Sequence, residues 1–203
     1  MKTPQYIFIH HTAVSWQKNP DQWKATNEYH KNKNWGTAAK PLWTPISSLG
    51  FYGGYNYEVA ANGSVHQFRK DGEVTVAQYQ KDMNDGRAIS ICLDGEFDSE
   101  LPTEEQKKAV AELLQIKMKA YNIPITNVFC HRHVAPKTCP GSKLPDDIYH
   151  YFVPMNPNPL PSDWAKQAWQ WLIDQGIIQP NSNPQDTVTK EWIGVVLYRL
   201  LKK

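Results

Sequence analysis

The residues best suited to metal chemistry lie in two short segments that are far apart in the sequence. In FCHRHVAPKTCPG, residues 129–141, His131 precedes Cys139 by eight positions, and the loop is stiffened by Pro136 between them and by Pro140 directly after Cys139. Imidazole nitrogen and thiolate sulfur are preferred ligands of zinc, and Gly141 permits a sharp turn just beyond the thiolate. Two ligands do not make a stable site, so a third is needed.

The second segment is QYIFIHHTAVS, residues 5–15, where His10 and His11 follow a short apolar run. Neighbouring side chains of a strand point to opposite faces, so one histidine can face a site while the other faces elsewhere. Either histidine could be the third ligand, which would leave the open fourth position typical of catalytic zinc. Spacing alone also allows a structural role, because histidines and especially cysteines are often buried in cores.

A mixed sheet is predicted to hold these segments. Apolar strands are expected at YIFIH, at AISICLDGEF in the centre of the sheet, and at ITNVFCH. The stretch YNYEVAANGSVHQF predicts a hairpin that turns at Asn62 and Gly63. The strand that ends at the His pair and the strand that ends at His131 can then present their last residues to one site.

Helices are expected between the strands. In NPDQWKATNEYHKN, Asn19 is predicted as N-cap with Pro20 at the first helical position. In TEEQKKAVAELLQIKMKAY, Thr103 and Gln106 form a capping box ahead of an apolar stripe. The predicted fold class is α/β, a central mixed β-sheet flanked by helices, plus a small C-terminal helical segment.

The proline-rich stretch VPMNPNPLPS cannot hold a helix or a central strand. We therefore expect three segments: a larger α/β domain at residues 1–153, a linker at 154–162, and a helical C-terminal domain at 163–203. Two helices are predicted in the last segment, the first ending at Gly176.

Composition excludes several other classes of protein. The 203 residues carry 22 basic and 20 acidic side chains, a net charge of +2 that does not indicate nucleic acid binding. The apolar run before the His pair is too short for a signal peptide, and no run approaches membrane-spanning length, so synthesis in the cytoplasm without membrane insertion is expected. An odd count of three cysteines argues against a disulfide framework. The sequence does not determine the oligomeric state, and a monomer is favoured.

Four stretches carry a family resemblance, and they occur in a fixed order: YIFIHHTA, GGYNYEVAANGSVHQ, AISICLDGEFDSELPTEEQ and CHRHVAPKTCPG. Together they resemble the zinc-dependent N-acetylmuramoyl-L-alanine amidase family, which includes phage endolysins and the peptidoglycan recognition proteins. The resemblance covers about residues 5–145. It implies the α/β fold of that family, a Zn²⁺ cofactor, and a zinc amidase catalytic domain at residues 1–153. For the helical C-terminal domain at 163–203, both cell-wall binding and a purely structural role stay open.

The resemblance assigns roles position by position. It implies His10, His131 and Cys139 as the zinc ligands, which selects the first histidine of the pair. It implies that Lys137 and Tyr55 assist catalysis.

Other polar and sulfur residues are expected to be structural or peripheral. We expect His11 to lie behind the site, His30 to be structural in its helix, Cys92 and Cys130 to lie in the core, and His133 to lie on the groove or surface. Asp94 and Glu96 are expected at a strand-end turn, although a carboxylate there could also touch substrate.

Two features depart from the family pattern. Residues 36–54 form a longer segment than in many relatives, and Trp43, Phe51 or Tyr52 could touch ligand there or simply pack. Gln78 stands where family members often carry a histidine, which leaves a ligand contact at that position in question.

The resemblance implies hydrolysis of the amide bond between N-acetylmuramic acid and L-alanine in bacterial peptidoglycan, by a phage or prophage endolysin that acts on the wall after release. The alternatives are a non-catalytic peptidoglycan-binding module and a zinc peptidase that cuts a stem-peptide bond.

Overall fold

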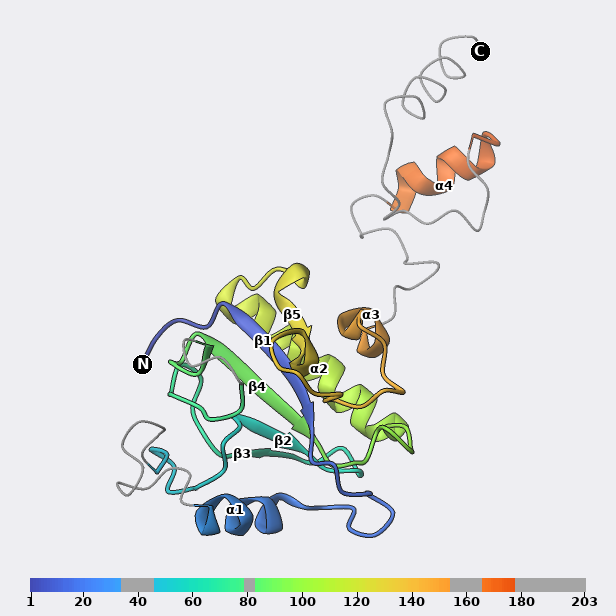
Figure 1. The fold of residues 1–203 in the computed structure, drawn as a ribbon. Coiled ribbons are helices and arrows are strands. Elements are labelled where there is room, and N and C mark those ends of the chain that lie inside the picture. Colours follow the sequence, from blue (N-terminus) through green and yellow to red (C-terminus); the bar gives the residue numbers. More distant parts are fainter. Residues whose placement is uncertain (34–45, 79–82, 154–165, 178–203) are drawn as a thin grey trace. The chain divides into compact units, whose positions relative to one another are not determined.

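The five-stranded sheet is the frame of the larger part of the chain (Figure 1). The structure, a computed structural model, describes residues 1–33, 46–78, 83–153 and 166–177, and the chain divides into two compact units, Met1–Val153 and Pro154–Lys203. The strand order is β3-β2-β4-β1-β5. The strands are β1 (Tyr6–His11), β2 (Tyr57–Val59), β3 (Val65–Gln67), β4 (Ala88–Leu93) and β5 (Val128–Cys130).

All neighbouring strands run parallel except the hairpin of β2 and β3. The predicted mixed α/β class is therefore confirmed. The hairpin is also confirmed: Gly63 has a φ of +82°, and the Asn62 side chain accepts a hydrogen bond from the Ser64 N–H. The last strand is shorter than predicted, because Ile125–Asn127 forms a 3-10 turn before β5 begins.

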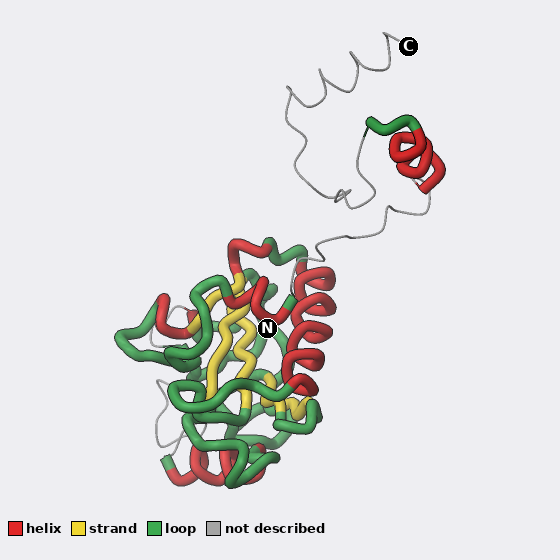
Figure 2. The backbone as a smooth tube through the Cα atoms, turned by 90° about the vertical axis from the view of Figure 1, so that its right-hand side faces the viewer, coloured by secondary structure: helices red, strands yellow, loops and turns green. Residues whose placement is uncertain are grey.

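One face of the sheet carries the apolar core. Alternate residues of the central strands, such as Ile9, Ile91 and Val59, are fully buried there and belong to one cluster. Helix α2 (Glu104–Tyr121) and the short helix α3 (Ile148–Phe152) add apolar side chains to this cluster. Figure 2 shows α2 running alongside the strands.

Helix α2 forms as its sequence predicts. The Thr103 hydroxyl accepts from the Gln106 N–H and the Gln106 side chain accepts from the Thr103 N–H, so the capping box is confirmed. Val110, Leu113 and Leu114 of the predicted stripe are buried. The Gln106 side chain also donates to carbonyls of β2 and of the turn after β4, which ties the start of the helix to the sheet.

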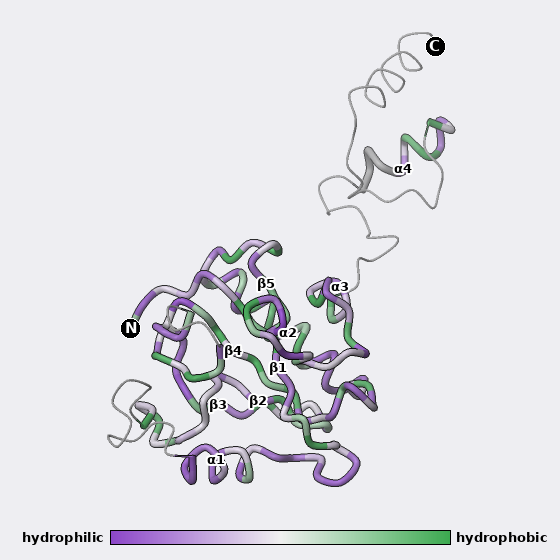
Figure 3. Tube along the Cα trace, in the orientation of Figure 1, coloured by the Kyte–Doolittle hydropathy of each residue, from purple (hydrophilic) through white to green (hydrophobic). Residues whose placement is uncertain are grey.

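The opposite face of the sheet carries several buried polar side chains beside Phe8. Across parallel strands, paired residues point to the same face, so Glu58 on β2, Cys92 on β4 and His10 on β1 lie in one row. Ser90 lies one step along β4 on that same face. Helix α1 (Trp23–Asn32) contributes to this side, and Figure 3 shows that it is mostly hydrophilic whereas β4 is hydrophobic.

The predicted start of this first helix is wrong. The helix begins at Trp23, four residues after Asn19, and its N-cap Gln22 makes no side-chain cap. The backbone before it bonds elsewhere: the Gln22 N–H donates to Asp94, and the Pro20 carbonyl accepts from the Ala61 N–H of the hairpin. These tertiary bonds hold residues 19–21 out of the helix.

In the second unit, α4 (Lys166–Asp174) is the described helix. Gly176 has a φ of +65°, and the Gly176 and Ile177 N–H groups donate back to carbonyls of the last turn. The prediction that the helix ends at Gly176 is confirmed. The predicted second helix of this unit lies outside the described residues.

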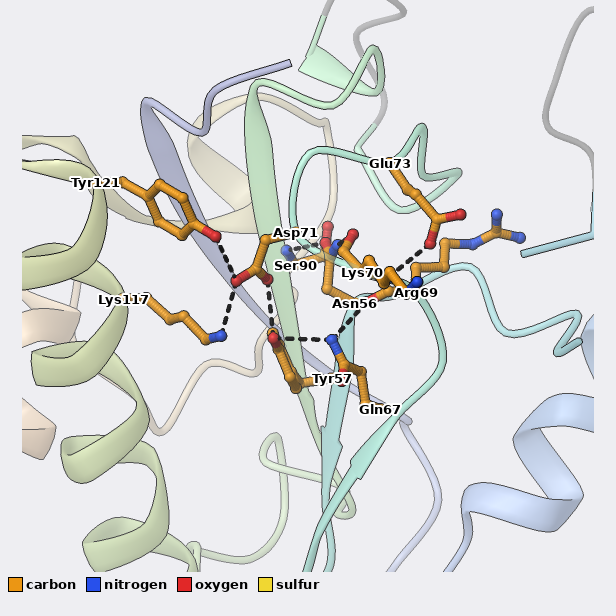
Figure 4. A network of polar contacts seen from close by, with 10 residues as sticks. All are labelled: Asn56, Tyr57, Gln67, Arg69, Lys70, Asp71, Glu73, Ser90, Lys117 and Tyr121. Carbon is orange, nitrogen blue, oxygen red and sulfur yellow. Dashed lines mark hydrogen bonds and ion pairs between the residues drawn. The ribbon is translucent and has the colours of Figure 1, made fainter. Parts of the chain in front are cut away.

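A polar network joins the hairpin to α2 (Figure 4). Asp71 accepts hydrogen bonds from the Tyr57 hydroxyl at 2.8 Å and the Tyr121 hydroxyl at 3.0 Å, and it pairs with Lys117 at 2.7 Å. The Asp71 and Lys117 side chains are only 9% and 17% exposed. Burial and the Asp71 charge raise the pKa of Tyr57, so its hydroxyl stays a hydrogen-bond donor.

We predict that Asp71→Asn lowers the free energy of unfolding by about 2 kcal/mol, because it leaves Lys117 nearly buried without a counter-charge. The matched control is Glu104→Gln, which breaks an ion pair of similar length to Lys107 on the same helix, at an 83% exposed carboxylate. That change should cost well under about 1 kcal/mol. Chemical denaturation measures both, and equal losses would contradict the prediction.

Candidate metal and catalytic site

Three potential metal ligands lie together at the carboxyl ends of β1 and β5. These strands are parallel neighbours, so His10 near the end of β1 comes close to His131, which directly follows β5. The centroids of the two imidazole rings are 4.5 Å apart, and the Cys139 Sγ lies 3.9 Å from the His10 Nδ1. The three ligand atoms all lie within 4.8 Å of one another.

The chemistry of these three side chains fits a zinc ion. His10 and His131 are 1% and 7% exposed, and the Nε2 atom of each is buried without a hydrogen-bond partner. Burial lowers the pKa of both, that of His131 to about 4, so both rings are neutral and able to bind a metal. Two nitrogens and one sulfur form a ligand set that zinc accepts.

Cys139 must lose its proton to bind a metal. Burial raises the pKa of the thiol to about 12 in the metal-free chain, and a hydrogen bond from the His11 backbone N–H opposes this shift. Metal binding would therefore displace a proton from Cys139, and the affinity should weaken as the pH falls.

The loop that carries Cys139 is held by Arg132, a residue that the sequence reasoning missed. Its guanidinium donates to the carbonyls of Thr138, Gly141 and Leu144, and its own N–H donates to the Cys139 carbonyl. Gly141 has a φ of +117°, and a Cβ there would lie 2.4 Å from the Phe97 carbonyl carbon. The expected sharp turn after Cys139 thus has a second reason, close backbone packing.

The three residues line one end of a cleft of about 420 Å³. Tyr55 and Lys137, expected to assist catalysis, line the same cleft, with the Tyr55 ring 5.2 Å from the His10 ring. Lys137 is exposed at its edge. Gln78 also lines the cleft, and its side chain bonds to Thr75 and Ser90, so it is held in place.

Tyr55 is positioned from two sides. Its hydroxyl is hydrogen-bonded to Cys92, and burial, followed by the nearby Cys92 and Cys139, raises the pKa of the phenol well above its ordinary value. Its ring lies 5.5 Å from the His30 ring of α1. His30 itself accepts a hydrogen bond from the Gly54 N–H, directly before Tyr55.

The structure also shows where the other residues named in the sequence analysis lie. Cys92 and Cys130 are fully buried, as predicted. His11 stacks on Phe97 and accepts from its N–H, which matches the expected place behind the site. Phe51 packs against Trp23 and Phe68, Tyr52 lies near Lys31, and Trp43 lies outside the described residues. His133 is exposed and pairs with Asp146, whereas Glu96 contributes to the turn through its backbone.

A pair of buried carboxyl groups was missed. The sequence reasoning treated Asp94 mainly as a strand-end turn residue and did not consider Glu58 at all. Both side chains are fully buried on the polar face of the sheet, and each affects the ionisation of the other. The signal available in the sequence was an acidic residue inside each of two β-rich stretches, at positions that the strand register brings together.

The mixed five-stranded sheet flanked by helices matches the α/β fold of a solved peptidoglycan amidase. The sequence model of N-acetylmuramoyl-L-alanine amidases matches residues 1–142, and the chain belongs to this family. No curated protein gives a significant match.

Solved structures agree with this assignment. The amidase LysC from Clostridium intestinale is 25% identical with a TM-score of 0.57, and the match covers 74% of this chain and 85% of that one. The Ph2119 endolysin from a Thermus scotoductus bacteriophage is 21% identical with a TM-score of 0.53, covering 70% and 79%. Drosophila PGRP-LB is 19% identical with a TM-score of 0.56, covering 80% and 88%. Family membership and the LysC match support peptidoglycan amidase activity. No helix among the described residues is long and apolar enough to cross a membrane.

The Cys139 loop generates a prediction about Asp98. This carboxylate accepts from the Ser142 N–H at 2.7 Å and from the Thr138 hydroxyl at 3.2 Å, and these bonds lower its pKa. Asp98→Ala should speed hydrogen exchange at residues 138–142, whereas Asp98→Asn, which keeps one acceptor, should speed it less.

Because the folded pKa of Asp98 is lowered, its stabilising contribution is present above the ordinary carboxyl pKa and is lost as the pH falls through the lowered value. The protection factors of the loop amides, which correct for the intrinsic pH dependence of exchange, should therefore fall only at acid pH in the unaltered chain. Unchanged exchange in Asp98→Ala would show that Arg132 alone holds the loop.

Proposed function

We propose that this chain is a zinc-dependent amidase that cuts the bond between the lactyl group of N-acetylmuramic acid and L-alanine in bacterial peptidoglycan. One observation carries the proposal: His10, His131 and Cys139 place three ligand atoms within 4.8 Å at one end of a cleft, and two buried imidazole nitrogens there have no hydrogen-bond partner. Such a set leaves one metal position for water or substrate.

An amide is a weak electrophile and water at neutral pH is a weak nucleophile. Zinc, when bound by these three residues, supplies polarisation of a carbonyl group and a more acidic water. The chain's own residues have three tasks: they hold the metal, orient the amide in the cleft, and stabilise charge where it develops.

Lys137 and Tyr55 suit the last task. The Lys137 ammonium lies at the cleft edge, where it can attract negative charge that develops on the carbonyl oxygen of the attacked amide. The Tyr55 phenol, held beside His10, can donate a hydrogen bond to the same region. Loss of one such donor typically costs on the order of 100-fold in rate.

The full set of candidate ligands and Lys137 favour an enzyme over a recognition module that only binds peptidoglycan. We further propose a phage or prophage endolysin in which residues 1–153 form the catalytic domain and residues 163–203 a helical domain that contributes to wall attachment. The family match to residues 1–142 supports the catalytic domain, and the likeness to an amidase named as an endolysin supports the endolysin role.

Digestion of purified sacculi tests the bond that is cut. The purified chain should release new L-alanine N-termini without new reducing sugar ends, and a chelator should stop the reaction until zinc is restored. Mass spectrometry of the fragments identifies the bond. New reducing ends, N-termini from within the stem peptide, or activity that survives the chelator would each refute the proposal.

Variants should separate metal binding from turnover. His10→Ala and Cys139→Ser should lose stoichiometric zinc, whereas His11→Ala, which removes a ring that stacks on Phe97, should keep it. Lys137→Ala and Tyr55→Phe should keep zinc and lose on the order of 100-fold in kcat. Metal analysis beside kinetics measures both effects, and normal turnover in either of the last two variants would remove that residue from the mechanism.

A further inference from the structure

Two carboxyl groups are buried together on the polar face of the sheet. Glu58 on β2 and Asp94 directly after β4 are each 0% exposed. If both groups are ionised, three of their oxygen atoms make no hydrogen bond of standard geometry: both oxygens of Glu58 and the Oδ1 of Asp94. Two adjacent buried negative charges would be strongly unfavourable, so this pair needs a compensating proton.

A single proton on Glu58 resolves the arrangement. Asp94 Oδ2 already accepts from the Gln22 N–H at 2.7 Å, as an ionised carboxylate does. The acid proton of Glu58 would then be donated to Asp94, and the Thr26 hydroxyl of α1 lies close enough to Glu58 to influence its ionisation. Two carboxyl groups with one proton between them carry one negative charge.

The surroundings of the pair favour keeping that proton. Burial raises the pKa of Glu58, and the negative charge of Asp94 raises it further. Burial also raises the pKa of Asp94, while hydrogen bonds from Gln22 and Glu58 oppose the shift. The titratable neighbours are Asp21, whose charge adds to the repulsion, and the neutral Cys92 and Tyr55.

Helix α1 is docked beside this pair by polar contacts. The N-cap Gln22 contributes its backbone N–H, and Thr26 and His30 are spaced four apart, so these two side chains share one face of the helix. Gln22 and Thr26 approach the carboxyl pair, and His30 accepts from the Gly54 N–H. Asn27, beside them, accepts from the Tyr52 and Gly53 N–H groups.

Two routes therefore lead from the pair to Tyr55. One runs through α1, where His30 holds the Gly54 backbone and its ring lies 5.5 Å from the Tyr55 ring. The other runs through Cys92, which lies beside Glu58 in the strand register and is hydrogen-bonded to the Tyr55 hydroxyl. A disturbance of Glu58 would reach Tyr55 from both sides.

We propose that Glu58 and Asp94 form a proton-sharing carboxyl pair that docks α1 on the sheet and thereby positions Tyr55. They are positioning residues, since neither lines the cleft. The effect on turnover rests on the proposed function, whereas the shared proton and the docking of α1 do not.

The proposal has a direct spectroscopic test in the full chain. The carboxyl ¹³C shift of Glu58 should be that of a protonated acid at neutral pH and should move to the carboxylate value only as the pH is raised further. Glu28→Gln, an exposed change on α1, should leave this behaviour unaltered. A carboxylate shift for both Glu58 and Asp94 at neutral pH would overturn the proposal.

The pair also makes stability depend on pH. Because the folded pKa of Glu58 is raised, the folded state keeps a proton that the unfolded chain releases above about pH 4. Its contribution is complete below that pH and is lost as the pH rises through the raised value. Glu58→Gln supplies a non-titrating donor, so its stability should fall less than that of the unaltered chain as the pH rises above about 4, while Glu28→Gln should follow the unaltered chain.

Turnover and helix docking give the last readouts. At neutral pH, Glu58→Gln should keep kcat within about twofold, and Glu58→Ala should lose on the order of tenfold or more with unchanged KM and zinc content. Amides of α1 should exchange faster in Glu58→Ala than in Glu58→Gln. Unchanged exchange and turnover in Glu58→Ala would overturn the proposal. If neither the unaltered chain nor any variant cuts peptidoglycan, the proposed function fails. Hydrogen exchange and the ¹³C shift then still decide the role of the pair.

Discussion

The pairing of β1 with β4 on one side and β5 on the other is the constraint on which the rest of the domain depends. It fixes which side chains of three strands share a face, so Ile9 and Ile91 enter the apolar core while His10 faces the cleft and the buried Cys92 lies beside it on the same face. A shift of one residue in this register would exchange the two sets. It would bury His10 among apolar side chains and remove a ligand atom from the site.

The two faces of the sheet are stabilised by different forces. The core face gains its stability from apolar burial against α2 and α3, a term that depends little on pH. The site face is held by directional bonds, from Gln22 to Asp94 and from Gly54 to His30, and its geometry depends on protonation states. This division keeps the scaffold robust while the precise placement of the cleft residues rests on a few polar contacts.

The sequence could predict the features that local patterns encode. The capping box of Thr103 and the burial of Cys92 follow from patterns within a few residues of each other, and the structure has them. The first helix was misplaced because its start is set by bonds from Gln22 and Pro20 to segments distant in the sequence, which outweigh the local preference of Asn19 for an N-cap. The loop spacing pairs His131 with Cys139, and the expected strand ends bring the histidine pair to them, but the choice of His10 over His11 could be made only through the resemblance.

The same reasoning explains why Glu58 escaped notice and why it can persist. Alone in a β-rich stretch it reads as an exposed position of a hairpin, and only the register with β4 places it beside Asp94. With one proton the pair carries a single negative charge, and a zinc ion held by two neutral imidazoles and one thiolate would carry a net charge of one positive unit. Glu58 and His10 are two strands apart, or roughly 10 Å, at which opposite unit charges in a protein attract by about 2 kcal/mol. A buried anion at this place thus offsets part of its own desolvation by its attraction to the occupied site, which an apolar residue in the same row could not do.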